Sequence, residues 1–302
     1  MAEYRPGLNW MIRGWSCLTL VLITVGALTA GEHAGLSIPD WPLAYGRLVP
    51  PFIGGIRFEY THRVIATVVG MISIIVALWL QKKEQRRWLR WLGWGAVLGV
   101  ILQGVLGGLT VLLRQPDWLT AFHASVAQLF FLLTVALAVF TGHDWLSLAG
   151  EENRVKGWIA LDGWSLAATL AILAQILLGA AYRHDALGIL PHVWGAVVVT
   201  LLVITAAAKA LNLAGERPGL RAPALLLLFI LLAQIGLGIW TYFVKIATLN
   251  AAQPPPARVI LATLHLVGGS FLLATAFWLA LRAWQAGAGR APEARTEEVI
   301  EA

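Results

Sequence analysis

Apolar residues run along this chain in eight long stretches that short polar segments separate. A helix needs roughly 20 apolar residues to cross a bilayer, and each stretch is close to that length. The pattern therefore predicts eight transmembrane helices. They are expected at residues 11–30, 62–80, 91–113, 120–141, 158–182, 190–211, 222–244 and 259–284.

Similar segments recur late in the odd-numbered predicted helices. They are LQGVLGGLTV (102–111), AQILLGAAYR (174–183) and AQIGLGIWTY (233–242). Each has a glutamine followed by small residues. Small residues let helices approach closely, and a glutamine inside a membrane needs a hydrogen-bonding partner. The repeat indicates two related halves, although a transporter built from repeats would show it as well.

We therefore expect an all-α integral membrane protein of eight transmembrane helices, arranged as two pseudo-repeated four-helix bundles. The expected units are residues 1–145 and 146–286. Residues 287–302 are small and charged, and they are predicted to form a disordered tail.

Composition agrees with residence in a membrane. The chain is 59% hydrophobic and 13% charged, which is too little charge to cover the surface of a soluble domain. Its 15 Trp suit the membrane interface. The net charge of +6 does not indicate nucleic-acid binding, because Lys and Arg lie in short loops between apolar stretches. The one cysteine, Cys17, excludes an intrachain disulfide.

The same Lys and Arg residues predict the orientation. If the N-terminus is inside, 15 of them lie in inner segments and 7 in outer segments. Inner segments of membrane proteins are enriched in these residues, so both termini are expected in the cytoplasm, with the protein in the cell membrane.

Four of the seven histidines lie near the outer ends of the even-numbered helices: His62, His123, His192 and His265. One buried histidine is more often a hydrogen-bonded core residue, but four at matched depth indicate a shared purpose. A neutral imidazole binds metals, and facing helices can hold a haem between two histidines. The expected pairs are His62 with His123 and His192 with His265. Zinc is less favoured, because no cysteine and few carboxylates stand near them.

The remaining histidines, His33, His143 and His184, lie in loops or at helix ends and are predicted to be solvated. This pattern predicts a membrane bundle with two haems. By itself it does not distinguish an electron carrier from an enzyme.

A carboxylate distinguishes the first half from the second. Glu59 lies three residues before His62, and the two share a face if the helix has already begun there. No acidic residue stands in that place before His192 or His265. Glu59 could instead oppose the helix dipole. The asymmetry favours one structural or electron-relaying haem and one reacting porphyrin.

Several segments together resemble the haem A synthase family, across all eight predicted helices and in order. They are GLSIPDWPLAYG (35–46), EYTHRVIATVVG (59–70), LQGVLGGLTV (102–111), FHASVAQLFF (122–131), LPHVWGAVVV (190–199) and ATLHLVGGSFLLA (262–274). The resemblance implies oxidation of a methyl group of haem O to a formyl group by successive hydroxylations. The product, haem A, serves cytochrome oxidase.

The resemblance also implies roles for residues. His62 and His123 would face the substrate haem O, and His192 and His265 would hold haem b. Glu59 would act at the reacting methyl group.

Partners follow from the same resemblance: an unidentified electron donor, with haem O synthase and cytochrome oxidase assembly factors as candidates. The haem sites are expected toward the outer face of the membrane. Haem propionates are anionic, and four arginines on the predicted outer side are candidates to bind them, with interfacial snorkelling as the alternative. They are Arg57, Arg63, Arg183 and Arg258.

The chain departs from the family pattern in two places. Many relatives carry a cysteine pair around PDWP, where this sequence has Ile38 and Ala44, so a mechanism that needs that pair cannot operate here. Ala30 stands where relatives often have arginine. The alternative function is a two-haem b-type membrane cytochrome that carries electrons, in which Glu59 is only a helix-start residue.

Overall fold

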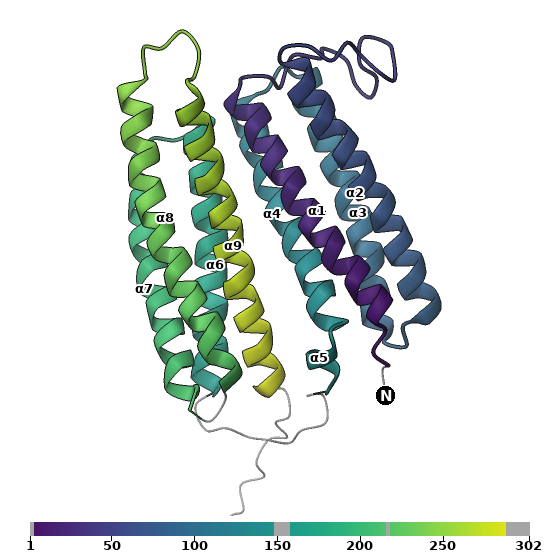
Figure 1. The fold of residues 1–302 in the computed structure, drawn as a ribbon, viewed down its shortest axis with the longest axis vertical. Coiled ribbons are helices and arrows are strands. Elements are labelled where there is room, and N and C mark those ends of the chain that lie inside the picture. Colours follow the sequence, from purple (N-terminus) through teal and green to yellow (C-terminus); the bar gives the residue numbers. More distant parts are fainter. Residues whose placement is uncertain (1–2, 148–157, 216–217, 288–302) are drawn as a thin grey trace, which may run out of the picture.

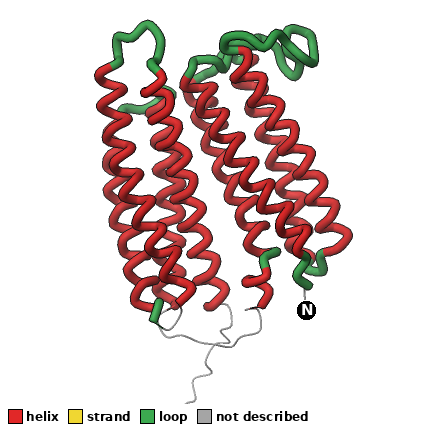
Figure 2. Tube along the Cα trace, in the orientation of Figure 1, coloured by secondary structure: helices red, strands yellow, loops and turns green. Residues whose placement is uncertain are grey.

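The computed structural model describes residues 3–147, 158–215 and 218–287, and the regular structure within them is helical (Figure 2). Eight helices are long and apolar enough to cross a membrane, which confirms the eight predicted spans. They are α1 (Pro6–Gly31), α2 (Ile56–Lys83), α3 (Arg87–Leu112), α4 (Asp117–Phe140), α6 (Trp158–Arg183), α7 (Ile189–Leu213), α8 (Arg221–Ala247) and α9 (Pro256–Gly287). A short helix α5 (His143–Ser147) and a 3-10 turn η2 (Pro218–Leu220) complete the set. The predicted disordered tail lies outside the described residues, except for Gly287, which ends α9.

The first turns of α2 are polar, and the apolar pattern therefore missed them. The helix begins at Ile56, six residues before the predicted start at residue 62. Glu59 lies in the first turn, where a carboxylate opposes the positive end of the helix dipole. Lys82 and Lys83 lie in the last turn, where positive charge is favoured.

The long helices form two groups (Figure 1), and the contacts between helices assign four of them to each group. In the first group, here called the N unit, α1 and α3 each contact both α2 and α4. In the second group, the C unit, α6 and α8 each contact both α7 and α9. The two units meet where α1 and α4 pack against α6 and α9. The expected boundary between residues 145 and 146 falls inside α5.

Each unit has its own apolar core. In the N unit, Trp15 is 1% exposed, and its indole N–H donates to the carbonyl of Val69 at 3.2 Å. A buried indole N–H needs such a partner. In the C unit, Ala206 and Ala207 of α7 pack with Leu273 of α9 at 0% exposure. The small side chains allow the helix backbones to approach closely.

Polar side-chain contacts join the two units. Ser270 of α9 donates to the side-chain oxygen of Gln128 on α4 at 3.0 Å. Gln285 of α9 donates to the backbone oxygen of Trp145 at 2.7 Å. Such contacts satisfy polar groups that lipid cannot.

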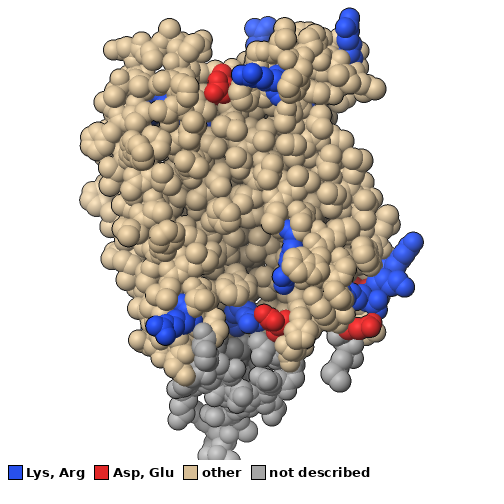
Figure 3. Space-filling model, viewed as in Figure 1, with Lys and Arg blue, Asp and Glu red and all other residues tan. Residues whose placement is uncertain are grey.

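Charged side chains gather at the two ends of the face seen in Figure 3, with an almost uncharged surface between them. This distribution suits a protein surrounded by hydrocarbon at mid-height. We call the end that carries the long connection between α1 and α2 the connection end, and the opposite end the N-terminal end (Figure 1).

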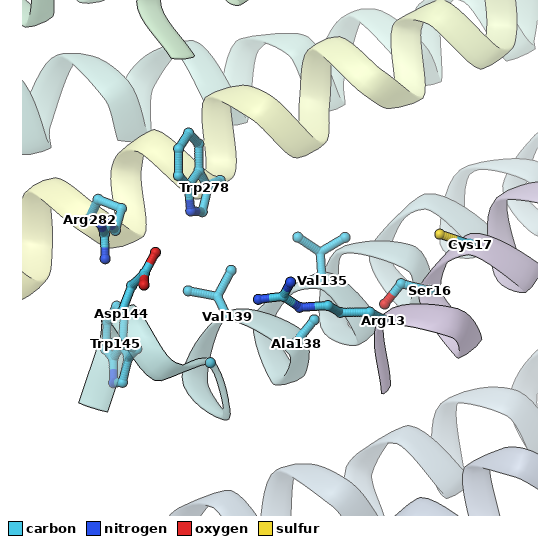
Figure 4. A pocket seen from close by; sticks show the side chains of 11 residues that line it. Arg13, Ser16, Cys17, Val135, Ala138, Val139, Asp144, Trp145, Trp278 and Arg282 are labelled. Atoms are coloured by element: carbon cyan, nitrogen blue, oxygen red, sulfur yellow. The ribbon is translucent and has the colours of Figure 1, made fainter. Parts of the chain in front are cut away.

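A cavity of about 400 Å³ lies between α1, α4, α5 and α9 at the N-terminal end (Figure 4). Arg13 and Arg282 line it together with Val139 and Trp278. None of the four candidate histidines lines it, so the histidine sites are separate from this cavity.

Candidate functional site

The four candidate histidines lie in one layer near the connection end. Helices α2, α4, α7 and α9 all begin there, as Figure 1 shows. The histidines stand between three and nine residues after the first residue of their helices. Because an α-helix rises about 1.5 Å per residue, their positions along the helices differ by at most about 9 Å. They are His62 on α2, His123 on α4, His192 on α7 and His265 on α9.

The C unit brings His192 and His265 together. Their ring centroids are 6.2 Å apart, and the ring planes are inclined at 80°. An imidazole nitrogen lies about 2 Å from a bound metal, so two axial ligands of one iron have ring centroids roughly 6 Å apart. The separation of this pair is therefore suited to sharing one iron.

The N unit brings His62 and His123 into the same neighbourhood. The Nδ1 atoms of both rings are buried and have no hydrogen-bond partner among the described residues. Buried polar atoms without partners are uncommon and call for an explanation. Ligands or groups that bind between the rings would provide one.

Each of the four rings packs directly against a glycine on the first or third long helix of its unit. A Cβ atom added to that glycine would lie 2.9 to 3.4 Å from the ring carbon Cε1, closer than ordinary contact. The pairs are Gly26 on α1 with His62, Gly107 on α3 with His123, Gly179 on α6 with His192, and Gly238 on α8 with His265. The absence of a side chain at these positions is what gives the imidazoles their space.

Glutamines support both histidines of the C unit. Gln175 Nε2 donates to the His192 carbonyl at 2.8 Å and lies 3.1 Å from the ring Nδ1. In the amide orientation that satisfies its neighbours, Gln234 donates to the His265 carbonyl at 2.9 Å and lies 3.1 Å from Nδ1. These contacts restrict how each ring can rotate.

Glu59 is buried at the start of α2, with 4% of its surface exposed. One carboxylate oxygen accepts from the backbone N–H of Ile38 at 2.8 Å. The other accepts from the guanidinium of Arg63 at 2.6 Å. The same guanidinium donates to the carbonyls of Asp40 and Leu43 at 2.8 and 2.9 Å. Glu59 and Arg63 thus fasten the α1–α2 connection to the first turns of α2.

Asp40 organises the connection itself. Its carboxylate accepts from the backbone N–H groups of Tyr45 at 2.6 Å and Gly46 at 2.7 Å. The Gly46 hydrogen bond, then that of Tyr45 and the charge of Arg63, lower the pKa of Asp40 below its ordinary value of 3.8. The carboxylate is therefore ionised at neutral pH.

Trp41, which lies in the α1–α2 connection, contacts α3 beside the histidine layer of the N unit. A Cβ atom on Gly108 would lie 2.6 Å from the Trp41 ring, so the indole rests on the backbone of α3 at that position. The preceding residue, Gly107, is the one that contacts His123. The connection therefore covers the N-unit site from the connection end.

The candidate arginines differ in their surroundings. Arg183 of α6 donates to the Ala27 carbonyl of α1 at 2.6 Å and so joins the two units. Arg258 is half-buried. Arg57 is exposed, with its guanidinium 4.9 Å from the centre of the Phe58 ring. Arg63 holds the connection, as described above.

A cationic cluster lies at the connection end of the C unit. Lys245 Nζ lies 3.9 Å from the centre of the Tyr182 ring and 3.9 Å from an Asp185 oxygen. Arg183 and Arg258 are its charged neighbours. The sequence analysis did not single out Lys245, because the residue becomes notable only once the helices bring the other cations to it.

His33 and His143 are exposed, as predicted, but His184 is not fully solvated. His184 follows α6 and is half-buried. Burial first, and then the charge of Arg183, lower its pKa to about 4. It is also a neighbour of His123 across the interface between the units. The prediction of solvation for His184 was wrong because the turn after α6 packs against the N unit.

Fold and site together define a multi-pass helical membrane protein with two pairs of histidines near one end. Residues 56–191 match the COX15-CtaA family, described as "Cytochrome oxidase assembly protein". This matched part contains two of the four histidines of the layer, His62 and His123.

Similar curated proteins bear the name "Heme A synthase". One from Alkalihalophilus pseudofirmus is 32% identical over 132 residues, which is 41% of this chain and 43% of the relative. One from Symbiobacterium thermophilum is 30% identical over 160 residues, or 51% of each chain. One from Exiguobacterium sp. is 27% identical over 247 residues, covering 74% of this chain and 79% of the relative. The chain thus spans about half the length of the first two relatives and more of the third.

These matches confirm the resemblance to the haem A synthase family that the sequence motifs indicated.

Proposed function

We propose that this protein is a haem A synthase, a membrane oxidoreductase that oxidises a methyl group of haem O to a formyl group by successive hydroxylations. The family resemblance supports the activity. The observation that carries the proposal is the asymmetry between the units: both contain a histidine pair, and only the pair of the N unit has the buried carboxylate of Glu59 within one helical turn, among the described residues.

The residues present fit two haems. His192 and His265 have the separation of two ligands to one iron, and they would hold haem b. His62 and His123 would hold haem O, and each ring rests against a glycine, Gly26 or Gly107, that leaves it space. The haem iron would supply the oxidative chemistry when bound, and the protein supplies position and electrostatics.

Glu59 is the proposed catalytic residue at the reacting methyl group. A buried carboxylate can hold or release a proton at a defined place. Hydrogen bonds from Ile38 and Arg63 fix its orientation. The α1–α2 connection, which these bonds fasten, would exclude water from the same site.

The candidate arginines would bind haem propionates, which are anionic. Arg183 and Arg258, with Lys245 beside them, favour the C unit as one such place. Arg63 and Arg57 would serve the N unit, where Arg63 already carries hydrogen bonds to the connection.

The proposed architecture is two pseudo-repeated four-helix bundles, residues 1–145 and 146–286, with both termini in the cytoplasm. The four equivalent contacts between histidine and glycine support the repeat. The excess of Lys and Arg in alternate connections supports the orientation, with the haem sites toward the outer face of the cell membrane. An electron donor, haem O synthase and cytochrome oxidase assembly factors are the proposed partners.

The test is co-expression with a haem O synthase in a host that makes no haem A, followed by extraction and chromatography of pigments. We expect haem A and its hydroxylated precursor from the unchanged chain. Glu59→Gln should abolish both products while haem stays bound. Glu32→Gln, which changes an exposed carboxylate at the end of α1, is the matched control and should leave them unchanged.

Two results would contradict the proposal. Haem-loaded protein that never modifies haem O, but undergoes reversible reduction of both haems, would indicate the alternative two-haem cytochrome. Equal product from Glu59→Gln and Glu32→Gln would remove Glu59 from the reaction.

A further inference from the structure

The cavity at the N-terminal end lies apart from the histidine layer (Figure 4). Its volume of about 400 Å³ falls within the range of pockets that bind small molecules. Side chains of α1, α4 and α5 of the N unit and of α9 of the C unit line it. The proposed reaction of haem O uses none of these side chains, so the cavity calls for a separate explanation.

Two arginines line the cavity from different units. Arg13 lies on α1, and Arg282 lies on α9. Among the described residues, neither guanidinium forms an ion pair with a carboxylate. The Arg13 guanidinium lies 5.3 Å from the centre of the Trp10 ring, a contact that does not neutralise its charge. Two guanidinium groups at one cavity favour an anion as the ligand.

One carboxylate also lines the cavity, and it leaves a positive charge in excess. Asp144 of α5 is exposed, and its nearest described cation is His143, whose Nδ1 lies 3.7 Å from a carboxylate oxygen. The formal charges of the lining side chains, two guanidinium groups and one carboxylate, sum to +1. A phosphodiester carries one negative charge and would balance this excess. Arginine suits it, because the planar fork of a guanidinium binds two phosphate oxygens at once.

The walls of the cavity are apolar, and the arginines lie near the ends of their helices. Val135 and Val139 of α4 line the cavity with Trp278 of α9. Arg13 stands seven residues after the first residue of α1, and Arg282 stands five residues before the last residue of α9. At 1.5 Å per residue, each lies roughly 8–11 Å from its helix end, a depth from which arginine reaches the headgroups of a bilayer. Apolar walls at that depth suit a lipid better than a water-soluble anion.

We propose that this cavity binds an anionic phospholipid, whose phosphate Arg13 and Arg282 hold. Basic pockets between transmembrane helices bind such headgroups in other membrane proteins. Because the two arginines belong to different units, the bound lipid links α1 to α9 at the end opposite the histidine layer. The inference does not rest on the proposed function, since the cavity shares no residue with the histidine sites.

The expected loss of affinity follows from the contribution of single basic residues. A Lys or Arg near a membrane surface typically strengthens the binding of anionic lipid by about fivefold. Removing the charge of Arg13 or of Arg282 should therefore weaken lipid binding by about fivefold, and removing both charges by about 25-fold.

The experiment titrates phosphatidylglycerol into the delipidated full chain in detergent and measures the bound lipid by native mass spectrometry. The variants are Arg13→Gln, Arg282→Gln and the double variant. Arg87→Gln is the matched control, because Arg87 is an exposed arginine that begins α3 at the same end and does not line the cavity. Phosphatidylethanolamine, whose headgroup adds a positive charge, tests the preference for an anionic lipid. Inorganic phosphate in large excess, added as a competitor, tests whether a free anion suffices.

We expect the unchanged chain and Arg87→Gln to bind phosphatidylglycerol equally, each single cavity variant about fivefold more weakly, and the double variant about 25-fold more weakly. Equal affinity in all variants would overturn the inference and show that the arginines only snorkel. Equal binding of phosphatidylethanolamine, or displacement of the lipid by inorganic phosphate, would overturn the assignment to an anionic lipid. If the double variant fails to fold, the single variants and the comparison of headgroups on the unchanged chain still decide the matter.

Discussion

Replacing Gly238 by alanine should displace the His265 imidazole and weaken haem binding in the C unit. The added Cβ would lie 3.0 Å from His265 Cε1. Carbon atoms in contact prefer separations of about 3.5–4.0 Å, so the ring must retreat by roughly 0.5–1 Å. Metal–ligand distances tolerate only about 0.2 Å, so the retreat takes the nitrogen out of bonding range or strains the backbone.

The expected loss of haem affinity follows from the known cost of overpacking a protein core. Forcing an extra carbon into a well-packed site typically costs about 1–3 kcal/mol. Since 1.4 kcal/mol corresponds to tenfold in affinity, haem binding should weaken by roughly 5- to 150-fold.

Gly236→Ala is the matched control, because Gly236 lies two residues away on α8 and an added Cβ there meets nothing within 4 Å. Both changes remove a glycine from the same helix and gain about 0.5–1 kcal/mol of helix stability. The measurement is the haem b content and Soret spectrum of purified protein. Equal haem b content in the two variants would refute the reasoning, since of the two glycines Gly238 contacts the His265 ring and Gly236 does not.

Two further changes test the connection and the helix packing. Asp40 has a lowered pKa, so its stabilisation of the α1–α2 connection is complete above its ordinary value of 3.8 and is lost as the pH falls through the lower folded value. Hydrogen exchange of the connection, corrected for the intrinsic rate, should stay constant from neutral pH down to 3.8 and rise only below it; a rise at higher pH would contradict this. Asn9 donates to the Ala138 carbonyl at 2.8 Å and to the Thr141 hydroxyl at 2.9 Å, so Asn9→Ala should lower stability by about 0.6–1.7 kcal/mol. Thermal unfolding in detergent measures this, and an unchanged midpoint would show that the bridge between α1 and α4 contributes nothing.

Sequence reasoning located the helices and the depth of the histidines. In hydrocarbon, backbone groups must be satisfied within the helix, so an apolar stretch of about 20 residues has little choice of structure. The rise per residue is fixed, so the distance of His192 from the start of α7 followed from counting, whereas His62 lies six residues further into α2 than its predicted start implied. The polar first turn of α2 was missed, because Glu59 interrupts the apolar pattern that marks a span.

Tertiary structure decided which groups meet. Nothing in the sequence required Glu59 to hold the N–H of Ile38, or Arg183 to reach Ala27 of the other unit. The repeated glutamine and glycine were visible along the chain, but their contact with imidazoles was not. Such contacts depend on how each helix is rotated about its axis and which neighbour it packs against, and packing between helices sets both. The sequence by itself determined eight spans and a layer of histidines, while helix packing decided their partners.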